Sequence, residues 1–264
     1  MTQEQRLDYL IKRFKEDSGE YRNLRTGNGA EEKRRALRSL MNVRMPGDMD
    51  AETLAAQDAY LQERAEEKGV VTPDMIPAAR NPRLSLWQGD ITRLAVDAIV
   101  NAANSQMLGC FVPMHNCIDN CIHTFAGVQL RNECARQMNI LRKRYGRDYE
   151  QPTAVPMLTD AFNLPAKKVV HIVGPIVQGN LTAENERDLA SCYRNTLDIC
   201  AENGLLTVAF CCISTGVFRF PPERAAEIAV GTVTDWMNAY AGKPERVIFN
   251  VFGDRDRAIY EKLL

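Results

Sequence analysis

The spacing of apolar side chains divides this 264-residue chain into two unlike parts. In residues 1–80, apolar positions recur at i, i+3, i+4 and i+7, the interval that places them on one face of a helix. Two stretches follow this interval: Leu7, Leu10, Ile11 and Phe14, and more briefly Ala36, Leu37, Leu40 and Met41. Pro73 and Pro77 then interrupt the pattern. We predict a helical N-terminal extension over 1–80 and a second unit over 81–264.

In the second unit, short apolar runs alternate with longer segments of helical spacing. The runs are rich in Val and Ile and nearly continuous, as in strands that are buried on both faces of a parallel sheet. They lie at 84–86, 95–100, 169–173, 208–213 and 247–252, and the helical segments lie at 118–138, 184–203, 222–240 and 254–264. This alternation predicts an α/β layered fold with a mainly parallel sheet.

Charge and cysteine content narrow the classes of function. The chain has 33 basic and 34 acidic residues, a net charge of −1, which leaves no global basic surface for nucleic acid or anionic lipid. No apolar run approaches the roughly 20 residues of a membrane span, and residues 1–6 lack a signal-peptide pattern. All eight cysteines lie between Cys110 and Cys212, where we expect free thiols or metal ligands. We therefore expect a cytoplasmic protein that binds neither nucleic acid nor membrane.

The loop at 109–117 carries the most distinctive chemistry. Cys110, His115 and Cys117 stand at Cys-x4-His-x-Cys spacing, directly after the motif Asn-Ala-Ala-Asn at 101–104. Two thiolates and an imidazole can supply three ligands to one Zn²⁺ and leave the fourth tetrahedral position for water or substrate. The alternative is that these are free cysteines and a histidine without a metal, because free cysteines are common inside proteins.

Three further groups follow predicted strands, and ligands of parallel sheets bind at the carboxyl ends of strands. Asp90 can accept a hydrogen bond from a base amine or a ribose, or it can cap a helix. Asn104 can orient hydroxyl groups or a water, or it can cap a loop. The loop from Ser214 to Phe218 contains glycine and precedes a helix, so its backbone N–H groups suit a diphosphate, with Phe218 and Phe220 beside a sugar.

These groups form an ordered set that resembles the macrodomain family over roughly 83–264. The blocks are GDIT at 89–92, IVNAAN at 99–104, IHTFAG at 122–127, NLPAK at 163–167, HIVGP at 171–175 and ISTG at 213–216. The resemblance implies a three-layer α/β/α sandwich with a mixed, mainly parallel sheet that binds ADP-ribose. One branch of the family hydrolyses ADP-ribose from modified proteins.

One departure from the family is informative. The glycine-rich loop of many hydrolytic macrodomains is replaced here by the loop at 109–117, which is similar to that of zinc-containing microbial macrodomains, some encoded beside sirtuin-like ADP-ribosyltransferases. The resemblance implies Zn²⁺ on Cys110, His115 and Cys117. It also implies that the substrate is bound by Asp90, Ile91, Asn104, Cys117, Ile118, Asp119, Ser214, Thr215, Gly216, Val217 and Phe218.

The resemblance further implies an activity and the roles of two residues. We expect zinc-dependent hydrolysis of the bond between mono-ADP-ribose and a protein side chain, on a protein modified by a sirtuin-like transferase, with ADP-ribose as product. Asn104 would orient the distal ribose, and Asp119 would orient or deprotonate the attacking water. We expect a nearby cation to lower the pKa of Asp119, which makes positioning as plausible as proton transfer.

His123 and His171 are expected to be structural.

Three alternatives remain open at this point. The protein could be a reader that binds ADP-ribosylated proteins without cleaving them, because one fold can host both functions. The zinc could be structural, with hydrolysis carried by Asn104 and Asp119. The substrate could instead be a small acylated ADP-ribose that the enzyme deacylates.

Overall fold

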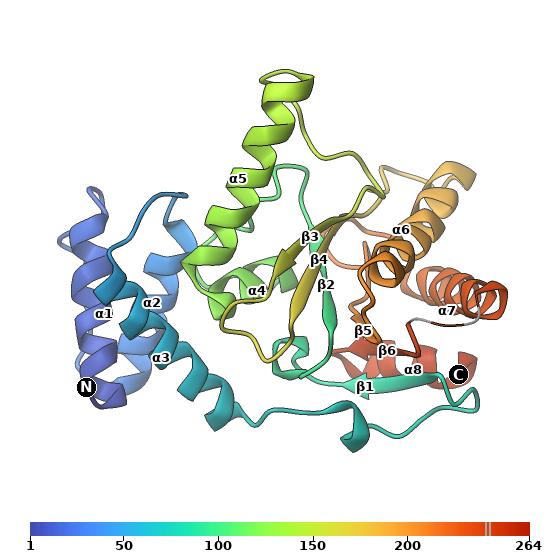
Figure 1. Ribbon diagram of the computed structural model, residues 1–264, viewed down its shortest axis with the longest axis horizontal. Coiled ribbons are helices and arrows are strands. Elements are labelled where there is room, and N and C mark those ends of the chain that lie inside the picture. The colour runs from blue at the N-terminus through green and yellow to red at the C-terminus, as the bar shows by residue number, and fades with distance from the viewer. Residues whose placement is uncertain (241, 243) are drawn as a thin grey trace.

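A six-stranded sheet forms the centre of the molecule, in the strand order β1-β6-β5-β2-β4-β3 (Figure 1). The computed structural model describes residues 1–240, 242 and 244–264. The strands are β1 (Leu84–Gln88), β2 (Ala98–Ala103), β3 (Met157–Asp160), β4 (Lys168–Val173), β5 (Thr207–Phe210) and β6 (Arg246–Val251). All pairings are parallel except that of β3 with β4, which is antiparallel. The mixed, mainly parallel sheet is thus confirmed.

The predicted strands are present, and the differences lie at their ends and at β3. Strand β2 begins later than predicted because Ala95 donates its N–H to the carbonyl of Val71, outside the sheet. Strand β5 ends at Phe210, before the predicted end at Ile213. Strand β3 was not predicted, since it is a four-residue edge strand with alternating burial and no Val or Ile.

Helices cover both faces of the sheet and complete the three layers (Figure 1). Helices α4 (Ile118–Ala126) and α5 (Val128–Tyr145) lie on one side, and α6 (Ala183–Glu202), α7 (Pro222–Ala239) and α8 (Asp254–Leu263) lie on the other. Two short 3₁₀ helices, η1 (Pro73–Met75) and η2 (Ile91–Arg93), flank β1.

The single helix predicted over 118–138 is wrong, because the chain turns at Gly127. This residue has a φ of 94°, a conformation that favours glycine. A Cβ at Gly127 would lie 2.7 Å from Gln57 Nε2 and 3.0 Å from Asn163 Nδ2, so the break is also a close-packed point. The turn lets the first turn of α4 lie beside the end of β2, where Asp119 accepts hydrogen bonds from Asn101 and Asn104.

The N-terminal extension consists of helices α1 (Gln3–Asp17), α2 (Ala30–Val43) and α3 (Ala51–Lys68). They share an apolar cluster that is separate from the main core and that includes Val128 of α5. Helix α3 was not predicted, because its buried face contains the polar residues Thr53 and Gln57 and so lacks an apolar stripe. The division at residue 80 stays a prediction. None of the described helices combines the length and the apolar character needed to cross a membrane.

Candidate functional site

The three candidate metal ligands converge in space. Loop 109–117, called the metal loop below, brings the ligand atoms of Cys110, His115 and Cys117 within 4.8 Å of one another. Cys110 Sγ lies 3.5 Å from His115 Nδ1, near the spacing of two ligands on a tetrahedral Zn²⁺ with bonds of about 2.0–2.3 Å. All three side chains are partly exposed, so a further ligand can approach them. The donor set fits zinc, although the metal itself stays a prediction.

Asn120 holds the metal loop closed. Its side chain is fully buried in the first turn of α4, and its Nδ2 donates to the carbonyls of Cys110 and Val112 at 3.1 and 3.0 Å. Its backbone N–H donates to Cys117 Sγ at 3.4 Å, where Cys117 caps the N-terminus of α4. Asn120 therefore contacts both ends of the loop and sets the separation of the two sulfurs.

The Cys117 sulfur lies where a bound cation would change its charge. Burial raises the pKa of the Cys117 thiol to about 12, and the neighbouring Cys110 adds to the rise. Cys117 is therefore a neutral thiol near pH 7 when no cation is present. A divalent metal binds the thiolate form, so metal binding at this loop must release the proton of Cys117.

Asp119 is fixed beside the metal loop by two asparagines. Asn101, in β2, donates from Nδ2 to Asp119 Oδ1 at 2.8 Å. Asn104, directly after β2, donates from Nδ2 to Asp119 Oδ2 at 3.2 Å and to the carbonyl of Gly109 at 3.2 Å. The two asparagines of the Asn-Ala-Ala-Asn motif thus hold one carboxylate, and the structure brings the candidate catalytic pair together.

The expectation that a nearby cation lowers the pKa of Asp119 stays a prediction, and the protein groups alone raise this pKa. Burial raises the pKa of Asp119 to about 6, and the Asn101 hydrogen bond and the charge of Arg131 only partly offset it. The reason is that a carboxylate loses water when it is buried, and this loss disfavours the charged form.

A second group of metal-type side chains lies deeper in the core. His123, Cys134 and His171 are all buried, with ligand atoms within 4.8 Å of one another. His171 Nδ1 lies 3.0 Å from Asn101 Nδ2 and its Nε2 lies 3.1 Å from Thr159 Oγ1, so the ring accepts from the amide and donates to the hydroxyl. Burial lowers the pKa of both histidines. Both are buried and neutral near pH 7, and the structural role expected of them stays a prediction.

Asp90 caps a helix, one of the two roles that the sequence allowed. Its Oδ1 accepts from the backbone N–H and the hydroxyl of Thr92, at the start of η2. Its Oδ2 lies 3.6 Å from Lys68 Nζ, at the end of α3. Ile91 is buried next to it. The cap uses one carboxylate oxygen and leaves the other on the side of Lys68.

The loop from Ser214 to Phe218 is tightly folded and presents unpaired backbone donors. Ser214 has a φ of 65°, and its carbonyl accepts from the N–H of Phe220 at 3.0 Å. Within the described part of the chain, the N–H groups of 215–218 have no protein acceptor. The prediction that Phe220 packs on a sugar is wrong, because Phe220 is buried in the core. Phe218 is partly exposed and stays a candidate.

Sequence reasoning missed the polar residues that support the site from a distance. Asn120 looked like an ordinary helix residue, and Lys68 and Arg38 belong to the N-terminal extension. Arg38 donates from one terminal nitrogen to the carbonyl of His115 at 2.7 Å. No local sequence signal could have revealed this contact, since 77 positions separate the two residues.

This chain is similar to known proteins in both sequence and fold. A family model described as the macro domain matches residues 100–229. A protein-ADP-ribose hydrolase of Treponema medium is 48% identical over 267 residues and covers 100% of both chains. One of Staphylococcus aureus is 41% identical over 260 residues, which is 98% of this chain and 95% of that one. The solved structure of a Trypanosoma brucei macrodomain in complex with ADP-ribose has a TM-score of 0.65 and 27% identity, and covers 86% of this chain and 94% of that one. This chain therefore belongs to the macro domain family.

Proposed function

We propose that the chain is a hydrolase that releases mono-ADP-ribose from a protein side chain and so reverses protein ADP-ribosylation. Relatives that match over nearly the whole chain carry the name protein-ADP-ribose hydrolase. The observation that carries the proposal is the position of Asn104, whose Nδ2 lies 3.2 Å from both Asp119 Oδ2 and the carbonyl of Gly109. One amide thus joins a buried carboxylate to the metal loop.

The loop from Ser214 to Phe218 would bind the diphosphate. Its backbone N–H groups lack protein acceptors, and a strand-to-helix loop of this kind offers such donors to an anion. Gly174 lies against this loop, since a Cβ there would come within 2.1 Å of Ser214 Oγ. The absence of a side chain at Gly174 therefore leaves the room that the Ser214 hydroxyl occupies at the start of this loop.

The adenosine would lie at the carboxyl ends of β1 and β6. Asp90 Oδ2 is free of the helix cap and could accept from an adenine amine, with Ile91 beside it. Phe252 directly follows β6, the neighbour of β1, and is 80% exposed. An exposed aromatic ring at this edge of the sheet is suited to stack on a base.

The distal ribose would then lie beside Asn104, Asp119 and the metal loop. Asn104 would orient a ribose hydroxyl, and Asp119 would orient the attacking water or accept its proton. Zn²⁺ on Cys110, His115 and Cys117 would supply Lewis-acid polarisation at this end of the substrate. The support for the metal is the convergence of two sulfurs and an imidazole within 4.8 Å.

The test uses an acceptor protein that a sirtuin-like transferase has mono-ADP-ribosylated, which is the substrate class that we propose. Mass spectrometry follows free ADP-ribose and the unmodified acceptor, and calorimetry measures binding of ADP-ribose to the same preparation. Release together with binding supports the hydrolase. The same measurement is repeated on acceptors with an ester linkage and with a glycosidic linkage, and binding without release from any of these acceptors would contradict the hydrolase and favour a reader.

A further inference from the structure

Helix α2 of the N-terminal extension contacts the metal loop through two polar side chains. Arg38 donates to the carbonyl of His115 at 2.7 Å and to Asn120 Oδ1 at 3.0 Å. Asn42 accepts the backbone N–H of Met114 on its Oδ1 at 3.0 Å. Two adjacent residues of the loop, one of them a candidate metal ligand, are thus hydrogen-bonded to the extension.

The Asn42 contact falls on a strained part of the loop. Met114 has a φ of 59°, a left-handed conformation that residues with a Cβ adopt at a cost of about 1–2 kcal/mol. Asn42 is only 1% exposed, and its Nδ2 donates to Thr124 Oγ1 at 2.7 Å. Thr124 in turn donates to the carbonyl of Asn120 at 2.7 Å. Asn42 therefore stabilises the loop directly and also through α4.

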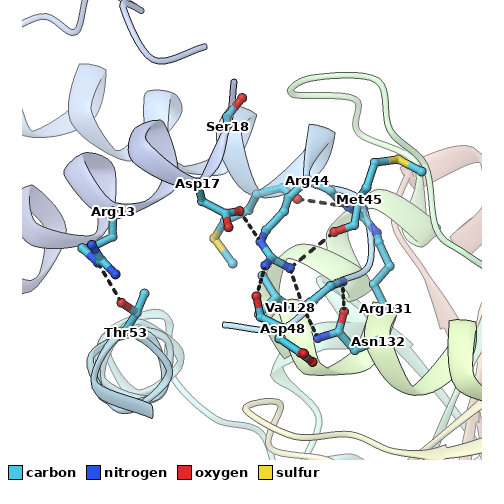
Figure 2. A network of polar contacts seen from close by, with 12 residues as sticks. Arg13, Asp17, Ser18, Arg44, Met45, Asp48, Thr53, Val128, Arg131 and Asn132 are labelled. Atoms are coloured by element: carbon cyan, nitrogen blue, oxygen red, sulfur yellow. Dashed lines mark hydrogen bonds and ion pairs between the residues drawn. The ribbon is translucent and has the colours of Figure 1, made fainter. Parts of the chain in front are cut away.

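Arg131 of α5 fixes the C-terminal end of α2, and Figure 2 shows its side chain beside Arg44, the residue that caps this helix. One terminal nitrogen of its guanidinium donates to the last carbonyls of α2 and its cap, those of Met41, Asn42 and Arg44. A cation at a helix C-terminus is favourable because the free carbonyls carry partial negative charge. Its Nε donates to the carbonyl of Leu108 at 2.8 Å, just before the metal loop. A single side chain thus joins α2, α5 and the start of the loop.

We propose that Asn42 and Arg38 are positioning residues for the metal, and that the N-terminal extension is a structural part of the metal site. This inference rests on the zinc site of the proposed function. Without Asn42, the Met114 N–H would lose its acceptor and the left-handed turn would be less stable. Without Arg38, the backbone that carries His115 would lose its anchor. Groups that orient metal ligands from outside typically change metal affinity by about 10–100-fold when they are removed.

The experiment compares zinc affinity in three single variants of the full chain. Asn42→Ala and Arg38→Met remove the two contacts. Asn132→Ala is the matched control, because Asn132 also joins α5 to the extension, exchanging hydrogen bonds of 3.0 Å with the backbone of Gly47, but does not touch the metal loop. Competition with a chromophoric chelator gives the zinc affinity, and the melting temperature of each metal-free variant reports stability separately.

We expect zinc affinity to fall about tenfold or more in Asn42→Ala and Arg38→Met, and to stay within about twofold of wild type in Asn132→Ala. Wild-type affinity in both test variants would overturn the inference, and so would an equal loss in the control, since that would indicate general destabilisation. If Asn42→Ala does not fold, the zinc affinity of Arg38→Met alone tests the inference. Failure of the wild type to bind zinc would instead contradict the metal site itself.

Discussion

Asn101 and Asp119 are joined by a hydrogen bond of 2.8 Å from Nδ2 to Oδ1, between a buried strand and the first turn of α4. The same Asn101 nitrogen lies 3.0 Å from His171 Nδ1. The Asp119 carboxylate is therefore held by the sheet through one oxygen, and its second oxygen accepts a hydrogen bond from Asn104. This arrangement fixes the direction of the Asp119 side chain before any substrate binds, which the proposed role of Asp119 in orienting a water requires.

The first prediction concerns Asp119. We expect Asp119→Asn to lower the rate of ADP-ribose release by about 10²–10⁴-fold, the usual contribution of a general base, because an amide cannot accept the proton. Binding of ADP-ribose should stay within a few-fold of wild type, as the replacement has the same shape. Single-turnover release and calorimetry measure the two quantities.

A matched control for this change is Asp160→Asn, at an exposed carboxylate that pairs with Lys168 at 2.6 Å on the edge strand. It should leave the release rate unchanged. Full turnover in Asp119→Asn would remove the carboxylate from the mechanism and leave catalysis to other groups.

The second prediction concerns the packing of Gly174 against the diphosphate loop. In Gly174→Ala the new Cβ would lie 2.1 Å from Ser214 Oγ and 2.8 Å from Ile213 Cγ2, so the side chains of Ser214 and Ile213 must shift. Overpacking of this kind costs about 1–3 kcal/mol. We expect weaker ADP-ribose binding by calorimetry, together with a lower free energy of unfolding.

Gly231→Ala serves as the control, because it lies in α7 and its Cβ would meet nothing within 4 Å. Alanine is favoured over glycine in a helix, so this variant should be more stable by about 0.5–1 kcal/mol with unchanged binding. Unaltered ADP-ribose affinity in Gly174→Ala would argue against the 214–218 loop as the diphosphate site.

The third prediction is a pH dependence of stability that arises from His171. Burial lowers its pKa to about 3, whereas the unfolded chain should have the ordinary value of about 6.5. Between these values the unfolded state binds more protons than the folded state. The free energy of unfolding therefore rises with pH across this window, and the stability is lost as pH falls below about 6.5.

The variant His171→Gln removes this titration and leaves the other titratable groups of the protein in place. Urea unfolding between pH 4 and pH 7 should give a shallower pH slope for the variant, by up to about 1.4 kcal/mol per pH unit. Equal pH slopes of the free energy of unfolding for the two proteins would contradict this prediction. They would mean that the His171 imidazole becomes protonated in the folded protein over the same pH range as in the unfolded chain.

The sequence predicted those parts of the fold and site that depend on local patterns. The Val-rich and Ile-rich runs marked β4 and β6 because strands buried on both faces need apolar side chains at every position. The three candidate metal ligands could be proposed from spacing alone, since Cys110, His115 and Cys117 lie in one short loop. Helix α3 was not predicted because its buried face contains the polar residue Gln57. This side chain is buried because it forms hydrogen bonds with α5, such as the one that it accepts from the Val128 N–H at 3.1 Å.

The supporting residues of the site could not be predicted, for a different physical reason. Asn42 and Met114 are 72 positions apart, and their hydrogen bond exists only after the extension has packed on α4 and α5. Asn120 contacts Cys110 and Val112 through a loop whose shape no periodicity encodes. Such contacts depend on the tertiary structure, so an asparagine in the sequence gives no sign of them.

The most direct test of the account is the metal dependence of ADP-ribose release. Mono-ADP-ribosylated protein is incubated with wild type, with Cys110→Ala, and with Cys200→Ala, which replaces a buried thiol of α6 outside the site. Zinc content, bound ADP-ribose and released ADP-ribose are measured on the same preparations. We expect that Cys110→Ala loses zinc and the release of ADP-ribose but still binds ADP-ribose, while Cys200→Ala retains zinc, binding and release. Release by a zinc-free Cys110→Ala at the wild-type rate would contradict this expectation.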